Sequence, residues 1–358
     1  MNQFKIFKNK KIIITGHTGF KGSWLTFWLY ILGARIIGVS KDIPSKPSLF
    51  QELRLKNKVV DIRLDIANLS GLKKIFKKYQ PDFVFHLAAQ SLVKKSYNSP
   101  VETFKSNTIG TLNVMESIKQ IKKKCYSVII TSDKSYKNLE IKRGYNENDI
   151  LGGKDPYSAS KAAAEHVIYS YIQSFYNKKK NNKYFAIARA GNVIGGGDWS
   201  KDRLIPDCIK AWSENRIAQI RNPNSTRPWQ HVLEAIRGYL ILIIKLQKNK
   251  NIHGQVFNFG PKQSQNKTVI QLLKEIRKKW KSISWKIVKY KKGDYESNLL
   301  RLNSKKAKNK LKWVPLLNFA ETIEMVASWY KYFYKNKGLK IEDFTRNQIF
   351  NYNEKIEF

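Results

Sequence analysis

The chain has 358 residues, more than one hydrophobic core usually holds, and 42% of them are apolar, so one large domain with a smaller companion is expected. No stretch approaches the roughly 18–20 apolar residues that span a bilayer, and the first ten residues do not resemble a signal peptide, which predicts a cytoplasmic protein with no membrane partner. The formal net charge of +40 could attract nucleic acid, but Lys far outnumbers Arg and no zinc-finger, RNP-like or heptad-linked basic motif accompanies it, so no nucleic-acid partner is expected.

Short apolar runs alternate with longer amphipathic stretches through the first half of the chain. Strands are predicted at 12–15, 35–40, 59–65, 83–88, 127–131 and 185–190, because these runs are short, apolar and often β-branched. Helices are predicted between them at 23–32, 69–79, 101–119 and 157–176. This alternation predicts an α/β fold, in which residues 1–190 form a Rossmann-type doubly wound parallel sheet with helices on both faces.

The second half of the chain has a looser pattern, with more Gly, Pro, Asn and Trp. Residues 191–336 are expected to form a smaller C-terminal substrate-binding α/β domain, with room for some segments to return to the main sheet. Residues 337–358 are expected to be a loosely attached basic tail. Cys125 and Cys208 lie far apart without metal-ligand spacing, so we expect two ordinary buried thiols and no metal site.

A glycine-rich loop lies directly between the first predicted strand and the first predicted helix. Glycines in a G-x-x-G-x-x-G pattern allow a tight turn and close approach of the backbone to a pyrophosphate, while the helix N-terminus supplies N–H donors. This position predicts a dinucleotide cofactor. The residues assigned to the loop site are Gly16, Thr18, Gly19, Phe20, Lys21 and Gly22.

The ends of the next strands complete the predicted cofactor site. Asp42 follows the second strand, where a carboxylate would hydrogen-bond the adenosine ribose and favour NAD over NADP, although it could also be a turn residue beside Lys41. Asp65 is placed to meet the adenine end. The remaining predicted cofactor contacts are Ile66, Leu87, Ala88, Ala89 and Asn107.

Tyr157 and Lys161 are predicted to lie on one face of a helix, because they are four residues apart. Asp155 is a suitable N-cap for that helix and Pro156 suits its first position. A nearby cation would lower the pKa of the Tyr157 phenol from about 10 and make it a general base. Ser132, at the end of the fifth strand, could hydrogen-bond the same phenol oxygen.

Taken together, these motifs resemble the extended short-chain dehydrogenase/reductase superfamily over about residues 10–330. Within it the likeness is to CDP-glucose 4,6-dehydratases. The residues that carry it are TGHTGFKGSW from Thr15, LAAQSLV from Leu87, TSDKSY from Thr131, DPYSASKAAAE from Asp155, RAGNVIGGGDW from Arg189, DRLIPD from Asp202 and RNPNSTRPWQHVLE from Arg221.

The resemblance implies a mechanism in three stages. Tyr157 takes the proton of the sugar 4-hydroxyl while NAD accepts hydride from C4, with Lys161 also holding the nicotinamide ribose. Water is then lost across C5 and C6, with Asp133 as the acid for the departing hydroxyl and Lys134, or a water relay, as the C5 base. Hydride finally returns to C6 and gives CDP-4-dehydro-6-deoxyglucose, for deoxysugar biosynthesis in surface polysaccharide.

The resemblance also implies the substrate contacts and the assembly. Diphosphate binding is expected from Asn192, with Arg203 and Arg227 as phosphate clamps, since a guanidinium engages phosphate bidentately. His231 could face the substrate or pack in the core. The full set of expected substrate contacts is Gln90, Ser91, Asn192, Arg203, Leu204, Arg227 and His231.

A homodimer or homotetramer is implied, through the helix of Tyr157 and residues 101–119. The alternatives are another nucleotide-sugar dehydratase or epimerase acting on dTDP-, UDP- or GDP-linked sugars, and a basic nucleic-acid-binding Rossmann protein without turnover.

Overall fold

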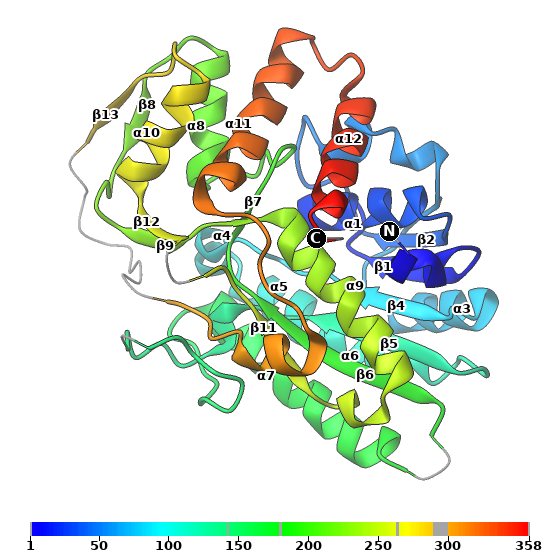
Figure 1. Cartoon of the computed structure of the whole chain (residues 1–358). Coiled ribbons are helices and arrows are strands. Elements are labelled where there is room, and N and C mark those ends of the chain that lie inside the picture. The colour runs from blue at the N-terminus through cyan, green and yellow to red at the C-terminus, as the bar shows by residue number, and fades with distance from the viewer. Residues whose placement is uncertain (1, 142, 179–180, 263–264, 289–299, 357–358) are drawn as a thin grey trace.

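The computed structural model describes residues 2–141, 143–178, 181–262, 265–288 and 300–356 (Figure 1). Within these residues a seven-stranded sheet has the order β11-β6-β5-β4-β1-β2-β3, and all its pairs are parallel. Its strands are β1 (Lys11–Thr15), β2 (Arg35–Ser40), β3 (Val60–Arg63), β4 (Phe83–His86), β5 (Cys125–Ile130), β6 (Lys183–Ala190) and β11 (Val256–Phe259). The predicted Rossmann-type doubly wound fold is thereby confirmed.

The strand order reverses at β1, which pairs with β2 on one side and with β4 on the other. Ligands of doubly wound sheets bind beyond the carboxyl ends of the strands at such a switch point. The loop after β1 therefore lies at the crevice where a cofactor is expected.

Helices cover both faces of the sheet because successive strand residues point to opposite sides. Ile12 and Ile14 pack with α1 (Phe20–Ile31) and α9 (Val232–Lys248), whereas Ile13 packs with helices on the other face. Those helices are α3 (Leu69–Tyr79), α6 (Gly110–Ile118) and α7 (Pro156–Tyr171).

Two predicted helices are interrupted. The predicted helix at 101–119 consists of α5 (Pro100–Phe104), a π-helical stretch (Lys105–Ile109) and α6. The predicted helix at 157–176 is α7 followed by a second π-helical stretch (Ile172–Tyr176). The helix at 69–79 has the predicted bounds, and the Asn68 side chain caps it by accepting from the Gly71 N–H at 2.9 Å.

The second half of the chain forms small sheets and helices beyond β6, and within its described residues it returns to the main sheet once, as β11. The chain passes directly from β6 into β7 (Val193–Ile194), which pairs with β10 (Gln230–His231). The other small sheets pair β8 (Ala218–Ile220) with β13 (Trp285–Ile287) and β9 (Thr226–Pro228) with β12 (Asn266–Thr268). The β8–β13 sheet lies with α8 (Leu204–Ser213) and α10 (Val269–Lys279) at the upper left of Figure 1, and the β9–β12 sheet lies below them on the same side.

The expectation of a loosely attached C-terminal tail is wrong. Residues 341–354 form α12 (Ile341–Glu354), which packs against α1 and against α11 (Phe319–Lys335) (Figure 1). Ile349 and Tyr352 are buried in the main core. The Tyr352 hydroxyl donates to Glu234 Oε2 at 2.8 Å and accepts from Arg237 Nε at 2.9 Å, so α12 is joined to α9 through buried polar groups.

Among the described residues, no helix is long and apolar enough to cross a bilayer. The described part of the chain also contains no cluster of three or more His, Cys, Asp or Glu side chains that could hold a metal ion. Cys125 and Cys208 are buried free thiols, as predicted. Two further short α-helices are α2 (Leu49–Glu52) and α4 (Val93–Asn98).

Candidate active site

The glycine loop after β1 is packed so closely that side chains are excluded at two of its glycines. Gly16 has φ +78°, and a Cβ atom there would lie 2.6 Å from the Ala88 nitrogen. A Cβ atom on Gly22 would lie 1.9 Å from the Gly16 carbonyl oxygen. Helix α1 begins at Phe20 with Gly19 as its N-cap, three residues before the predicted start. Lys21 and Gly22 therefore lie in the first turn of the helix, where the N–H groups face the loop.

A buried histidine ties this loop to the neighbouring strands, and sequence reasoning missed it. His17 Nδ1 lies 2.8 Å from Ser40 Oγ, and His17 Nε2 lies 2.9 Å from Asp61 Oδ1. Burial lowers the pKa of His17, although Asp61 opposes the shift. Asp61 in turn accepts from Arg63 at 2.7 Å. Asp61 and Arg63 flank Ile62 in β3, so both point to the same face of the sheet. This alternation was the signal in the sequence that a polar partner such as His17 lies on that face.

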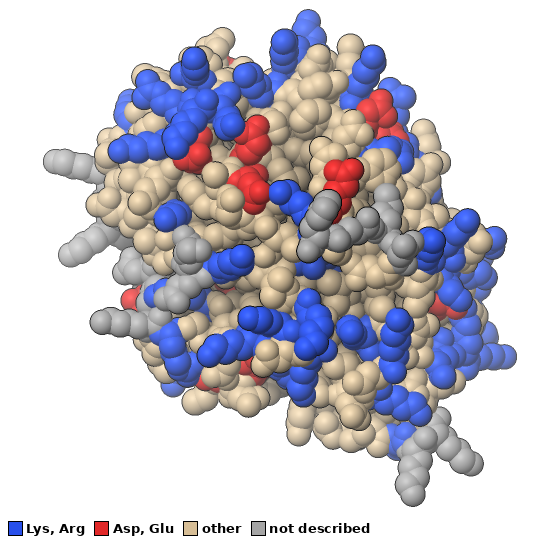
Figure 2. Space-filling model, in the orientation of Figure 1, with Lys and Arg blue, Asp and Glu red and all other residues tan. Residues whose placement is uncertain are grey.

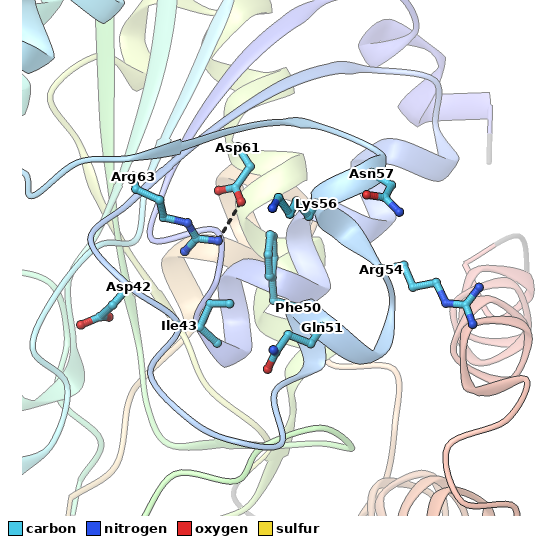
Figure 3. A pocket seen from close by; sticks show the side chains of 9 residues that line it. All are labelled: Asp42, Ile43, Phe50, Gln51, Arg54, Lys56, Asn57, Asp61 and Arg63. Carbon is cyan, nitrogen blue, oxygen red and sulfur yellow. Dashed lines mark hydrogen bonds and ion pairs between the residues drawn. The ribbon is translucent and has the colours of Figure 1, made fainter.

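A cavity of about 810 Å³ lies beside this network, between the ends of β2 and β3 and helix α2 (Figure 3). Asp42 lines it together with Asp61 and Arg63, whereas none of the predicted catalytic residues does. Thr18 Oγ1 donates to the Asp42 carbonyl at 2.6 Å, which joins the glycine loop to the end of β2. The predicted ribose ligand is thus next to the loop and at the rim of an open space.

Asp65 lies at the carboxyl end of β3, as predicted for the adenine end of the site. It accepts from the Ala67 N–H at 2.9 Å and pairs with Lys41 at 3.0 Å. Burial acts to raise the pKa of Asp65, but the Ala67 N–H and Lys41 outweigh it and the pKa is lowered. Asp65 is therefore an ionised acceptor near neutral pH. Its neighbour Ile66 packs against Gly110, where a Cβ atom would come within 2.4 Å of the Ile66 Cδ1 atom.

The segment after β4 is held by Asn107. The Asn107 side chain accepts from the Gln90 N–H at 2.8 Å and donates to the Gln90 carbonyl at 3.0 Å and to Ser160 Oγ at 2.9 Å. Leu87 and Ala88 run beside the glycine loop, with their N–H groups donating to the Thr15 carbonyl and to the Thr15 hydroxyl. Asn107 thereby connects the 87–91 segment, which includes Ala89, to the helix of the predicted catalytic Tyr.

The turn that carries the predicted catalytic residues, 132–135, follows β5 and is termed the catalytic turn. Ser132 caps it by accepting from the Lys134 N–H at 3.2 Å and donates to Asp133 Oδ1 at 3.0 Å. Asp133 is 5% exposed, and burial raises its pKa even though Lys134, the Ser132 hydrogen bond and Lys21 act in the opposite direction. A buried carboxyl with a raised pKa keeps its proton to higher pH, as a general acid requires. Lys134 is partly exposed beside it.

Tyr157 and Lys161 lie in the first two turns of α7, with Asp155 as the N-cap, as predicted. Both side chains are buried. The expected lowering of the pKa of Tyr157 is not found: burial raises it, with Asp133 adding to the shift and a hydrogen bond with Ser132 and the charge of Arg203 opposing it. Burial and the charge of Lys21 lower the pKa of Lys161 to about 8, although Glu165 opposes the shift. Desolvation of Tyr157 thus outweighs the two groups that favour its phenolate, Ser132 and Arg203.

Lys21 couples the cofactor loop to these groups. Its pKa is lowered to about 8 by burial and by the charge of Arg203, while Asp133 acts to raise it. Arg203 itself donates to Asp198 Oδ2 at 3.1 Å and to Ser91 Oγ at 3.4 Å. The fold therefore brings two predicted substrate residues together that lie 112 positions apart in the chain.

The other predicted substrate residues lie in different settings. Asn192 is exposed between the buried ends of β6 and β7, and Leu204 begins α8. Arg227 lies in β9, half-buried, and donates to the Thr226 carbonyl at 2.9 Å. His231 is fully buried, caps α9 by accepting from the Leu233 N–H, and packs edge-to-face on Trp24. This environment favours packing over substrate contact for His231.

The chain matches known proteins over most of its length. Residues 13–326 match the family described as GDP-mannose 4,6 dehydratase. The chain is 40% identical over 338 residues to CDP-glucose 4,6-dehydratase of Salmonella typhimurium, which covers 93% of this chain and 94% of that protein.

Two solved structures share the fold. An epimerase of Methanothermobacter thermautotrophicus has a TM-score of 0.80 at 23% identity, over 94% of this chain and 96% of that one. The UDP-glucuronic acid 4-epimerase of Bacillus cereus, solved with UDP-glucuronic acid and NAD, has a TM-score of 0.75 at 25% identity, over 90% of this chain and 99% of that one. The chain therefore belongs to the GDP-mannose 4,6-dehydratase family of the extended short-chain dehydrogenases/reductases.

Proposed function

We propose that the chain is an NAD-dependent CDP-glucose 4,6-dehydratase, which converts CDP-glucose to CDP-4-dehydro-6-deoxyglucose and water. The observation that carries the proposal is the buried turn of Ser132 and Asp133 next to the Tyr157 and Lys161 pair. An epimerase needs only Tyr157 and Lys161, the pair for the oxidation, whereas a dehydratase also needs an acid for the departing hydroxyl. The full-length relationship to a CDP-glucose 4,6-dehydratase at 40% identity supports the same substrate.

The glycine loop fits a dinucleotide. Gly16 and Gly22 leave no room for a Cβ atom, and the N-terminus of α1 presents N–H donors and its positive dipole end to the loop. The residues proposed to hold NAD are the loop residues with Asp42, Asp65, Ile66, Leu87, Ala88, Ala89, Asn107, Tyr157 and Lys161. When bound there, NAD would accept a hydride from the sugar C4 and return it at C6.

The residues of the chain supply the proton transfers. Tyr157, which is hydrogen-bonded to Ser132, would take the proton of the sugar 4-hydroxyl. Lys161 would hold the nicotinamide ribose. Asp133 would protonate the departing C6 hydroxyl, which its raised pKa favours. Lys134, partly exposed beside Asp133, would remove the C5 proton directly or through a water.

We also propose that residues 191–336 bind the substrate. Arg203 and Ser91 are in contact, and Arg203 lies close enough to Tyr157 and Lys21 to influence both of their pKa values. Arg203 is thus suited to clamp the diphosphate of a sugar whose C4 lies at Tyr157. Gln90, Asn192, Leu204 and Arg227 complete the proposed substrate contacts, and His231, which is buried against Trp24, is left out of them.

The proposed protein is a cytoplasmic homodimer or homotetramer that makes deoxysugar for surface polysaccharide such as O-antigen. Exposed apolar side chains on α5, the π-helical stretch after it and α7 support the assembly: Val101 is 76% exposed, Ile109 47% and Tyr169 66%. A lone exposed hydrophobe needs no explanation, but several on adjacent helices are typical of an interface.

A second candidate is a dehydratase or epimerase for another nucleotide sugar, since dTDP-D-glucose 4,6-dehydratase of Dictyostelium discoideum is 29% identical over 70% of this chain. A remote candidate is a nucleic-acid-binding protein without turnover. The Lys and Arg side chains are spread over the visible face, at its upper left, across its lower middle and at its right, and do not gather over one element (Figure 2), which gives that candidate little support.

A turnover panel of CDP-, dTDP-, UDP- and GDP-hexoses, with identification of each product, tests the proposal. We expect a 4-keto-6-deoxy sugar to form from CDP-glucose alone, or from CDP-glucose with the highest kcat/KM among the hexoses of the panel. A 4-epimer as the product, or a higher kcat/KM with another nucleotide, would replace it with the second candidate. Binding to DNA with a steep dependence on salt and no turnover of any hexose would favour the remote one.

A further inference from the structure

A buried ion pair lies behind the catalytic turn and takes no direct part in the proposed chemistry. Arg189, near the end of β6, donates from Nε to Glu165 Oε1 at 2.8 Å and to Glu165 Oε2 at 3.0 Å, and its terminal nitrogen also contacts Oε2. The side chains are only 3% and 4% exposed. A buried ion pair is a poor way to gain stability, because both charges lose their hydration. Its position in the fold therefore needs another explanation.

The pair contacts the residues at both ends of the catalytic turn. Thr131, which precedes the turn, donates from its hydroxyl to Glu165 Oε1 at 2.7 Å. Tyr136, which follows the turn, lies under the guanidinium of Arg189, 4.5 Å from carbon to ring centroid. Displacing either charged group would therefore release one end of the segment that carries Ser132, Asp133 and Lys134.

The same ion pair connects the catalytic turn to α7, the helix that carries Tyr157 and Lys161. Glu165 follows Lys161 by four residues and Tyr157 by eight in α7, so the three side chains lie along one face of the helix. On the other side, Arg189 is two residues before Gly191, which packs against Asp133. Helix α7, the catalytic turn and the end of β6 thus meet at one buried contact.

Further hydrogen bonds fix the Arg189 end of this contact. Arg189 Nη1 donates to the Glu147 carbonyl at 3.2 Å, and the Glu147 carboxylate accepts from the Asn258 N–H at 2.9 Å. The Tyr136 hydroxyl donates to Asn258 Oδ1 at 2.8 Å. These three hydrogen bonds and the cation–π contact of Arg189 with Tyr136 form a ring through Arg189, Glu147, Asn258 and Tyr136, so the guanidinium has little freedom to move.

We propose that Glu165 and Arg189 are positioning residues that hold Asp133 and Lys134 in register with Tyr157 and Lys161. The inference rests on the proposed function, because the groups it aligns are those of C4 oxidation and of water elimination. The carbon that is oxidised and the carbons that lose water are neighbours in one sugar. Both sets of groups must therefore reach it without the sugar leaving the site, and misplacement by about 1 Å can reduce a rate about a hundredfold.

Two single variants test this role with little change in volume. Thr131→Val removes the hydroxyl bond to Glu165 and leaves the ion pair intact. Arg189→Lys keeps the charge but loses the planar fork that engages Glu165 and covers Tyr136. Arg143→Lys is the matched control, since Arg143 forms a bidentate pair with Asp149 at 2.6 and 2.7 Å, but on the surface.

The two half-reactions are measured separately in single turnovers with CDP-glucose. The transient absorbance of the reduced nicotinamide reports C4 oxidation, and the absorbance of the 4-keto-6-deoxy product in alkali reports elimination. Exchange of the C5 proton with deuterated solvent gives an independent measure of the second half-reaction. Thermal unfolding of each variant separates loss of the fold from loss of alignment.

We expect Thr131→Val and Arg189→Lys to slow elimination and C5 exchange at least about tenfold more than oxidation, and Arg143→Lys to change neither. Equal slowing of both half-reactions, or rates like those of Arg143→Lys, would overturn the positioning role. Failure of the proposed function would be seen in the unaltered chain, which would then form no 4-keto-6-deoxy product from CDP-glucose.

Discussion

Gly191 and Asp133 are packed so that a Cβ atom on Gly191 would lie 3.2 Å from Asp133 Oδ2. Such a separation is tighter than an ordinary van der Waals contact, and Asp133 is held on its other oxygen by Ser132. The glycine after β6 thus sets the space for the proposed acid, a relation between residues that lie far apart in the sequence.

Gly191→Ala is therefore expected to displace the Asp133 carboxyl and slow elimination about tenfold or more. The backbone should accept Ala, because Gly191 is not among the described glycines with positive φ. Single-turnover rates of product formation check this, with NAD affinity as the control for the rest of the site. An elimination rate equal to that of the unaltered chain would mean that Asp133 can move without loss.

Tyr157→Phe is expected to reduce kcat by about a hundredfold to ten-thousandfold, because the phenol is the proposed base for the 4-hydroxyl. The ring is buried and loses only its hydroxyl, so the fold should be retained. Steady-state turnover of CDP-glucose and equilibrium binding of NAD are the two measurements. A variant that binds NAD and turns over at the normal rate would remove Tyr157 from this role.

Lys134→Ala is expected to slow C5 solvent exchange and elimination more than C4 oxidation. Lys134 is partly exposed beside the buried Asp133, so its removal should leave the core unchanged. Deuterium incorporation at C5 and the transient of reduced nicotinamide measure the two effects. Unchanged exchange at C5 would place the base elsewhere, as a water relay would.

The pH profile should have an alkaline limb near pH 8. Lys161 has a pKa of about 8, lowered first by burial and then by Lys21, so the cation is present below that pH and is lost as the pH rises through it. The cation is proposed to hold the nicotinamide ribose, and kcat/KM should therefore fall above about pH 8 as that contact is lost.

Lys21→Met identifies which amine is responsible for that limb, since Lys21 also has a pKa of about 8. Removing a like charge should raise the pKa of Lys161 and move the limb to higher pH. Disappearance of the limb in this variant would assign it to Lys21 instead.

Tyr352→Phe is expected to lower the free energy of unfolding by about 1–3 kcal/mol. The hydroxyl is fully buried and bonded to Glu234 and Arg237, so its loss leaves two charged side chains with fewer partners. Urea denaturation measures the change. Tyr239→Phe is the control, because Tyr239 is equally buried but its hydroxyl has no hydrogen-bond partner among the described residues and should contribute little. Equal stability of both variants would mean that α12 is held by apolar contacts alone.

Local rules in the sequence determined much of the fold. Strand β2 and helix α3 have the predicted bounds, because their apolar periods are regular and Asn68 caps α3 within the same segment. The glycine loop and the Tyr157 and Lys161 pair were also readable, since their function depends on spacing along a single turn or helix.

The tertiary structure decided what depends on residues far apart in the chain. Helix α12 could not be recognised, because its sparse apolar residues acquire meaning only against α1 and α11. The raised pKa of Tyr157 follows from burial, which spacing does not reveal.

The contacts of His17 with Asp61 and of Glu165 with Arg189 join separate strands and helices. The sequence by itself thus determined which reactive groups the chain carries and which element bears each. The tertiary structure alone decided how those elements are held together, because side chains from distant segments meet only when the core is packed.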